Sequence, residues 1–222
     1  YYSEIRGKRS ITEPEGWQIC TTNPDVIKLA VDFCRNYLDN HPGNHTVSLS
    51  MNDGGGFCTC SECSKYDQPD PISGAARRAV VFANTVAREI NKSHPGKGVS
   101  FYAYLTTLEP PLDMKCDQNV VVVLADSGSC VFHSYLDENC GLARDARLRL
   151  QAWQKICKKV VVYDYYGLYG DYMGLPFSSI KRTIENARYA QKIGAQGFTY
   201  DATYVPGPQG LHYWAAMRSV WD

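Results

Sequence analysis

The chain has 222 residues, of which 44% are hydrophobic and 21% charged, so it can bury one sizeable core or most of an α/β barrel, which usually needs about 250 residues. Its 23 basic and 23 acidic residues give a formal net charge of zero. This argues against nucleic acid or an anionic membrane as a partner, because proteins that bind either usually carry an excess of basic residues. No apolar run approaches the roughly 20 residues of a membrane span, and no signal peptide is visible, so we expect a mature or fragmentary chain.

Strands and helices are predicted to alternate along the chain. After a strand at 17–22, Asn23 caps a helix that Pro24 opens, and an apolar stripe follows at helical spacing. Further strands are expected at 46–51, 99–106, 119–126, 160–163 and 197–200, and further helices at 79–90, 142–157, 180–193 and 211–221. Six strands in this order predict a parallel sheet with right-handed crossovers. The continuous apolar run before Asp126 is typical of a strand covered on both faces.

Four of these strands end in an acidic residue: Asp53, Asp126, Asp164 and Asp201. The carboxyl ends of parallel strands share one edge of a sheet, so these side chains are predicted to converge on one pocket. The alternative is ordinary turn chemistry, because aspartate often follows a strand as a helix cap or turn residue. The first of the four lies in Asn52-Asp53 before three glycines, which allow a ligand to approach the backbone closely.

Cysteines and sequons suggest an oxidising compartment. Asn44-His45-Thr46 and Asn91-Lys92-Ser93 fit the N-glycosylation pattern, and nine cysteines in a chain of this kind predict disulfides in a secreted or lumenal protein. The odd count leaves at least one thiol free or paired outside the chain. Eight cysteines are disulfide candidates: Cys20, Cys34, Cys58, Cys60, Cys63, Cys116, Cys130 and Cys140.

The closely spaced Cys58, Cys60 and Cys63 have two interpretations. A zinc site requires a fourth ligand, for which His133 or Cys116 are candidates. Because the compartment is expected to be oxidising, we predict disulfides at these cysteines and no metal or other cofactor. Cys130 and Cys140 flank one loop and are candidates to pair with each other, with His133 as a loop histidine between them.

Several motifs resemble one known family. They are Gly7-Lys-Arg9, Trp17-Gln-Ile-Cys-Thr21, Ser48-Leu-Ser-Met-Asn-Asp-Gly-Gly-Gly-Phe-Cys-Thr-Cys-Ser-Glu-Cys63, Tyr104 with Pro110-Pro111, Val162-Tyr-Asp-Tyr165 and Trp221-Asp222. Together they are similar to the domain of unknown function 4838, which is linked to glycoside hydrolase family 163, endo-acting β-N-acetylglucosaminidases on complex N-glycans. The resemblance covers nearly the whole chain. It implies an α/β fold, a (β/α)8 TIM-type barrel incomplete at its N-terminus, with residues 1–222 a single barrel domain covering about the last six strands.

The resemblance also implies roles for the strand-end residues. Asp53 would be the general acid and Asn52 would orient an acetamido group. Asp164 would be a second carboxylate, and Asp126, Asp201, Tyr104, Tyr165 and Tyr200 would bind the sugar. Acids of such enzymes include glutamate, yet no predicted strand here ends in one. The implied partner is an N-glycan substrate. The alternative is a non-catalytic extracellular module on the same barrel that binds glycans or serves an extracellular assembly.

Overall fold

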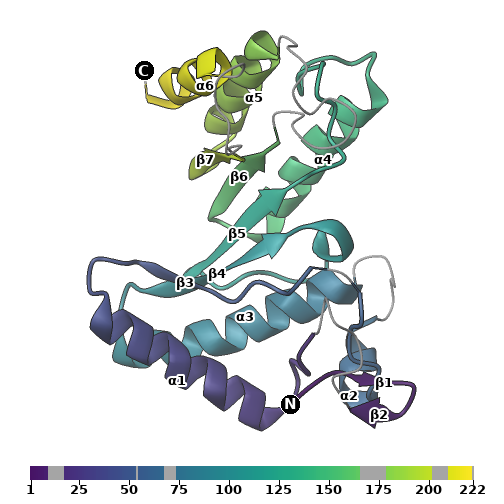
Figure 1. Cartoon of the computed structure of the whole chain (residues 1–222), viewed down its shortest axis with the longest axis vertical. Coiled ribbons are helices and arrows are strands. Elements are labelled where there is room, and N and C mark those ends of the chain that lie inside the picture. Colours follow the sequence, from purple (N-terminus) through teal and green to yellow (C-terminus); the bar gives the residue numbers. More distant parts are fainter. Residues whose placement is uncertain (10–17, 54, 68–73, 166–178, 202–209, 222) are drawn as a thin grey trace. The chain divides into compact units, whose positions relative to one another are not determined.

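A computed structural model describes residues 1–9, 18–53, 55–67, 74–165, 179–201 and 210–221 (Figure 1). They form two compact units, residues 1–123 with 155–159 and residues 124–154 with 160–222. A five-stranded sheet has the order β3-β4-β5-β6-β7, which is also the order of these strands in the sequence. The pairs β3–β4 and β6–β7 are parallel, as the alternation of strands and helices predicts.

The chain has an α/β fold, but the prediction of a (β/α)8 barrel is wrong. The sheet has five strands, whereas a parallel barrel closes with eight. Of the strand predicted at 17–22, the structure describes residues 18–22, and these do not join the sheet; Ile19 forms an isolated antiparallel bridge with Tyr2. Gln18 and Cys20, on either side of Ile19, are buried, so this segment packs within its unit without entering the sheet.

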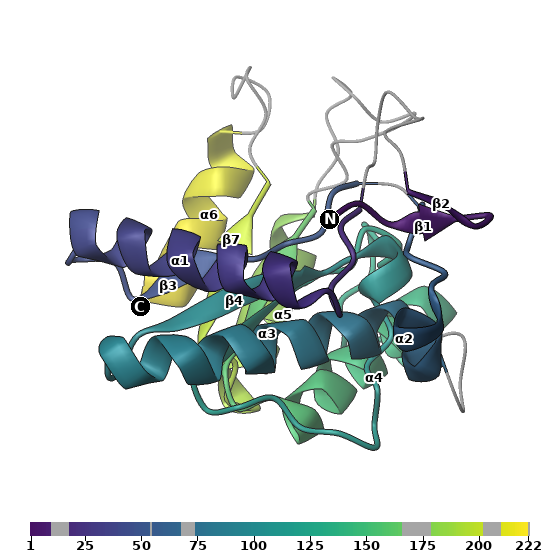
Figure 2. The same cartoon turned by 90° about the horizontal axis from the view of Figure 1, so that it is seen from below.

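The first unit is built on two long helices. In α1 (Pro24–Asn40), Asn23 Oδ1 accepts hydrogen bonds from the backbone N–H groups of Asp25 and Val26, so the predicted cap is confirmed. Helix α3 (Gly74–Ser93) buries its predicted apolar stripe, which comprises Ala79, Val80, Phe82, Ala83, Val86, Ala87 and Ile90. Figure 2 shows α1 and α3 side by side along β3 (Thr46–Ser48) and β4 (Gly98–Ala103).

Short elements complete this unit. The hairpin β1 (Glu4–Ile5) and β2 (Lys8–Arg9) is antiparallel. After β3 the chain forms a one-turn helix α2 (Ser61–Ser64) and a 3-10 turn η1 (Lys65–Asp67). A second 3-10 turn, η2 (Leu105–Thr107), follows β4.

The second unit contains the last strands and helices. Strand β5 (Val120–Ala125) leads into it, followed by α4 (Gly141–Ile156), β6 (Val160–Asp164), α5 (Ile180–Lys192), β7 (Gly197–Tyr200) and α6 (Gly210–Trp221). The core includes Leu150 and Trp153 of α4 and Val160 and Val162 of β6. The buried face of α5 differs from the predicted apolar stripe, because it includes Arg182, Thr183 and Asn186. These polar side chains indicate a buried polar network rather than a purely apolar helix contact.

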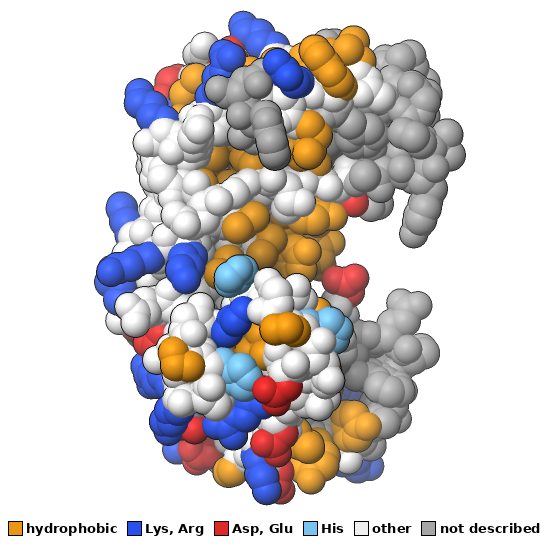
Figure 3. Space-filling model, turned by 90° about the vertical axis from the view of Figure 1, so that its left-hand side faces the viewer, with side chains coloured by type: hydrophobic (Ala, Val, Ile, Leu, Met, Phe, Trp, Pro, Cys, Tyr) orange, Lys and Arg blue, Asp and Glu red, His pale blue; other side chains and the backbone are white. Residues whose placement is uncertain are grey.

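The surface carries both signs of charge. Acidic and basic side chains lie side by side on the face drawn in Figure 3. On α3, for example, Lys92 pairs with Glu89 at 2.5 Å. Among the helices that the structure describes, none combines the length and hydropathy of a membrane span.

Candidate functional site

Two strand-end carboxylates of the second unit form ion pairs with arginines of the covering helices. Asp126, directly after β5, pairs with Arg149 of α4. Asp164, the last residue of β6, accepts a hydrogen bond from Arg182 of α5 at 2.6 Å, and both side chains are only 2% exposed. Because the partners lie on helices, these two carboxylates point to the helix-covered side of the sheet.

The Asp164 carboxyl is strongly desolvated. Burial raises its pKa, and the negative charge of Asp126 adds to this effect, while the charge and hydrogen bond of Arg182 oppose it. Arg182 also donates to the carbonyl oxygen of Cys130 at 2.9 Å and to Ser129 Oγ at 3.3 Å, so it ties the loop after β5 to β6. The buried Tyr135 also feels the charges of Asp164 and Arg182. Burial raises the pKa of its hydroxyl.

Tyr163 and Asp201 lie on the opposite face of the sheet. Side chains alternate along a strand, so Tyr163 and Tyr165 point away from the face that carries Asp164. The Tyr163 hydroxyl donates to Asp201 Oδ1 at 3.0 Å, and its ring lies 5.2 Å from that of Tyr165. Oδ2 of Asp201 is buried and has no hydrogen-bond partner within the described part of the chain. Tyr200 pairs in register with Asp164 and packs its ring 5.0 Å from Phe198.

The other predicted site residues belong to the first unit. Asn52 and Asp53 are exposed after β3, and the carbonyl oxygen of Asn52 accepts a hydrogen bond from Gln18 Nε2 at 2.7 Å. Gly56 has φ +73°, a conformation that glycine adopts without strain, so this loop needs a glycine there. Tyr104 is half-buried at the start of η2. The predicted convergence of Asp53 with the second-unit acids stays a prediction.

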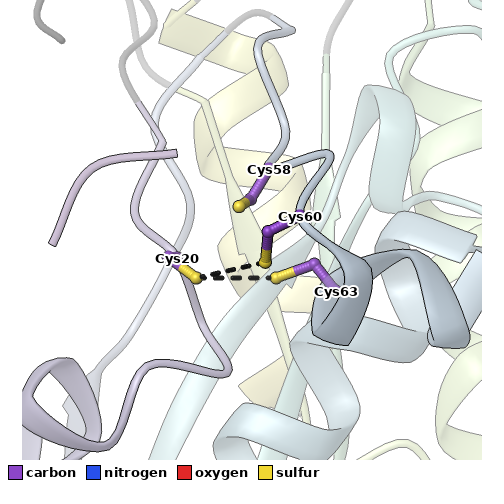
Figure 4. Close-up of side chains that lie close together, drawn as sticks. All are labelled: Cys20, Cys58, Cys60 and Cys63. Carbon is purple, nitrogen blue, oxygen red and sulfur yellow. Dashed lines mark hydrogen bonds between the residues drawn. The ribbon is translucent and has the colours of Figure 1, made fainter. Parts of the chain in front are cut away.

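Four cysteine thiols converge in the first unit (Figure 4). They come from the segment before α1, the loop after β3 and helix α2, and they are 0–9% exposed: Cys20, Cys58, Cys60 and Cys63. All four sulfurs lie within 4.8 Å of one another. Cys20 Sγ is 3.8 Å from that of Cys60 and 3.7 Å from that of Cys63. This group is called the four-cysteine cluster below.

The predicted disulfides are absent, because all nine cysteines are free thiols. In the four-cysteine cluster the two sulfur separations given above far exceed the S–S bond length of about 2.05 Å. The fourth thiol beside Cys58, Cys60 and Cys63 is that of Cys20, and not one of the candidate fourth ligands His133 and Cys116. Cys20 was hard to identify from the sequence, because nearly forty positions separate it from Cys58.

Hydrogen-bond donors surround the cluster. The backbone N–H of Glu4 donates to Cys58 Sγ at 3.2 Å, Arg9 Nη1 lies 3.7 Å from the same sulfur, and the Thr22 hydroxyl is 3.2 Å from Cys63 Sγ. Burial by itself raises the thiol pKa of Cys60, but the backbone N–H of Cys63, the neighbouring thiols and Arg9 outweigh it and lower this pKa to about 6. Burial raises the pKa of Cys63 to about 12.

The remaining cysteines lie elsewhere. Cys34 is buried in α1, and burial raises its pKa to about 11. Cys116 faces Cys157, a contact that the candidate disulfides omitted. In the second unit Cys130 Sγ lies 3.2 Å from His133 Nδ1, and with Cys140 these atoms form a smaller group within 4.8 Å. Both sequon asparagines, Asn44 and Asn91, are exposed, and glycosylation stays a prediction.

Three site residues were not identified from the sequence. Arg149 and Arg182 lie on helices that the sequence marks mainly by their apolar spacing, and Tyr163 belongs to a predicted strand and a family-like motif without a predicted site role. A usable signal existed for Arg182, because Arg182 and Asn186 are four residues apart on α5 and therefore share one helix face.

Comparison with known families identifies a match along the chain. The model of the family described as Domain of unknown function (DUF4838) matches residues 1–222. No curated protein matches the chain.

Proposed function

The chain belongs to the DUF4838 family along its whole length, and from this premise we propose that it is a glycoside hydrolase-like protein that acts on N-acetylglucosamine-containing glycans. The proposed compartment is secreted or lumenal, where N-glycans occur, and the exposed sequons at Asn44 and Asn91 support it. The substrate class follows from the motif resemblance, and the chemistry is assigned to this chain's own residues.

The proposal rests on the hydrogen bonding of the two carboxylate oxygens of Asp201. One carboxylate oxygen accepts from Tyr163, and the other is buried without a partner among the described residues. Buried polar atoms almost always have a hydrogen-bond partner, so an unmatched carboxylate oxygen at a strand end favours a polar ligand such as a sugar hydroxyl. The adjacent Tyr163–Tyr165 ring pair supplies aromatic surface of the kind that packs against sugar rings.

Each residue then has a role. Asp53 is the proposed general acid that protonates the leaving oxygen, and Asn52 orients the acetamido group. Both side chains are exposed and therefore accessible to substrate. Asp201 binds sugar hydroxyls. Asp164 is assigned to positioning, because its carboxylate is buried against Arg182 on the helix side of the sheet.

The test is incubation of the chain with an N-glycoprotein, followed by mass analysis of the released glycans and the remaining protein. An endo-acting enzyme leaves one N-acetylglucosamine on the asparagine. Asp53→Asn is nearly isosteric and should lower the release rate at least about 100-fold. Asp32→Asn, an exposed position on α1, should leave the rate unchanged. Wild-type turnover in Asp53→Asn would remove Asp53 from the role of acid.

A second candidate, a non-catalytic glycan-binding module, is favoured by the ion pairing of Asp126 and Asp164. Both carboxylates are engaged by arginines, which disfavours their use as catalytic acid or nucleophile and fits a rigid binding scaffold better than an enzyme. In that case glycans are bound without release, and Asp201→Asn weakens binding while Asp53→Asn does not. A binding titration beside the release assay separates the two candidates.

A further inference from the structure

We propose that Cys20, Cys58, Cys60 and Cys63 bind one Zn²⁺ ion as a tetrahedral tetrathiolate site. The inference is independent of the glycan chemistry, because it rests on the arrangement of four side chains in the first unit. It gives a role to cysteines that the proposed enzymatic function leaves unused.

The sulfur positions match the geometry of the ion. Zinc binds thiolates at about 2.3 Å, and the edges of a tetrahedron with that radius are about 3.8 Å long. The measured Cys20–Cys60 and Cys20–Cys63 separations are 3.8 and 3.7 Å. The remaining sulfur pairs lie within 4.8 Å, so a small adjustment brings all four thiols into one coordination sphere.

Other chemistry fits the arrangement less well. An iron–sulfur cube needs its cysteines farther apart, because iron and sulfide ions lie between them. Disulfides need sulfur atoms about 2.05 Å apart, whereas Cys20 Sγ lies 3.8 and 3.7 Å from the sulfurs of Cys60 and Cys63. Four thiolates around one centre are typical of zinc, and a closed set of four protein ligands is typical of a structural rather than a catalytic site.

The surroundings suit an anionic metal centre. Four thiolates around Zn²⁺ carry a net charge of about −2, and buried charge needs compensation. The N–H of Glu4 and the guanidinium of Arg9 approach Cys58 Sγ, and the hydroxyl of Thr22 approaches Cys63 Sγ. Donors therefore face the sulfurs from outside the coordination sphere, where they would orient the ligands.

The ion would join the N-terminal segment to the continuous stretch that runs from the loop after β3 into α2. The N-terminal segment carries Cys20, the loop after β3 carries Cys58 and Cys60, and α2 carries Cys63. Gln18, two residues before the first of these ligands, already holds the carbonyl of Asn52. Zinc at this site would therefore fix the loop that contains Asn52 and Asp53, and its loss should loosen that loop.

Metal analysis of the chain, purified under reducing conditions without a metal-affinity step, tests the proposal. We expect one zinc ion per chain in the wild type. Cys63→Ser should hold less than about one-tenth of an equivalent, because a closed site loses one of its four ligands. Cys34→Ser is the matched control, since it removes an equally buried thiol outside the cluster and should keep the wild-type zinc content.

A second measurement does not depend on the folding of a variant. Replacement of zinc by Co²⁺ in the wild-type chain should produce the intense thiolate-to-metal charge transfer and visible bands of tetrahedral cobalt. Alkylation mapped by mass spectrometry should modify the four cluster cysteines at least about tenfold faster after chelation. The proposal is overturned by a wild-type chain that binds neither metal, by iron as the resident ion, or by Cys63→Ser with full zinc content.

Discussion

The sulfurs of Cys20 and Cys63 lie 3.7 Å apart although 43 positions separate the two residues in the sequence. Closing so long a loop restricts the unfolded chain, and a metal that clips its ends stabilises the folded state most when the loop is long. The four-cysteine cluster should therefore hold the N-terminal segment, which carries Cys20, against the loop after β3 and α2. Neighbouring interactions that hold the loop of Cys58 should contribute to the same outcome.

Arg78 of α3 is one of those interactions. Its Nη1 donates to the carbonyl oxygen of Cys58 at 2.6 Å, and its Nη2 pairs with Asp67 at 2.5 Å. Arg78→Ala leaves this carbonyl and the carboxylate without their donor, so we expect the free energy of unfolding to fall by about 2–3 kcal/mol in urea titrations. Metal content should fall in parallel if the loop no longer docks.

Arg88→Ala is the control on the same helix. Arg88 pairs with Asp117, but its side chain is 65% exposed. Its substitution should therefore lower the free energy of unfolding by less than about 1 kcal/mol. Equal destabilisation by the two substitutions would show that the Cys58 carbonyl contact contributes nothing beyond a surface ion pair.

Gly98, the first residue of β4, has no space for a side chain. A Cβ atom there would lie 1.7 Å from the backbone carbonyl oxygen of Asn119, and backbone cannot rotate away as a flexible side chain does. Gly98→Ala should therefore lower the free energy of unfolding by at least about 3 kcal/mol, measured in urea. Gly43→Ala, at an open position, should change it by less than about 1 kcal/mol.

Sequence patterns predicted the individual helices and strands better than the number of strands in the sheet and its closure into a barrel. The apolar stripe of α3 and the Asn23 cap follow from local spacing, and both are found in the structure. The number of strands in the sheet was wrong because residues 17–22 alternate like a strand, whereas burial of Cys20 among other thiols draws the segment away from the sheet. Long-range thiol packing is not encoded in local periodicity.

The candidate site was predictable only in part. A strand followed by aspartate correctly marks the ends of β5, β6 and β7, but the sequence does not say on which face each side chain lies. Asp164 and Asp201 end neighbouring strands, yet one pairs with Arg182 and the other with Tyr163. A shift of one residue reverses the face, so side-chain direction depends on register and strand ends that only the structure provides.

The raised pKa of Asp164 should make the stability of the folded chain depend on pH. Burial makes the protonated carboxyl more favourable in the folded chain than in the unfolded chain. Its contribution to stability is therefore fully present below the unfolded pKa of about 4 and is lost as pH rises through the higher folded pKa. Asp164→Asn lacks this titration. The unfolding free energy of the wild type minus that of the variant should thus decrease as pH rises from about 4 to 8.

Paired urea titrations across this range measure the difference directly. An increase with pH would mean that Arg182 lowers the folded pKa of Asp164 below its unfolded value, so that ion pairing outweighs burial.

Tyr163→Phe tests whether the hydroxyl that holds Asp201 matters for ligand binding. The substitution removes one hydrogen bond of 3.0 Å and keeps the ring pair with Tyr165, so the fold should be retained. Asp201 then loses its orienting donor, and glycan affinity or the release rate should fall about three- to tenfold, which corresponds to the usual contribution of one hydrogen bond. Tyr189→Phe is the matched control, because its hydroxyl accepts from Gln151 between α4 and α5. If both variants weaken binding equally, the effect comes from general loss of packing in the unit, and Asp201 is not the group that contacts the sugar.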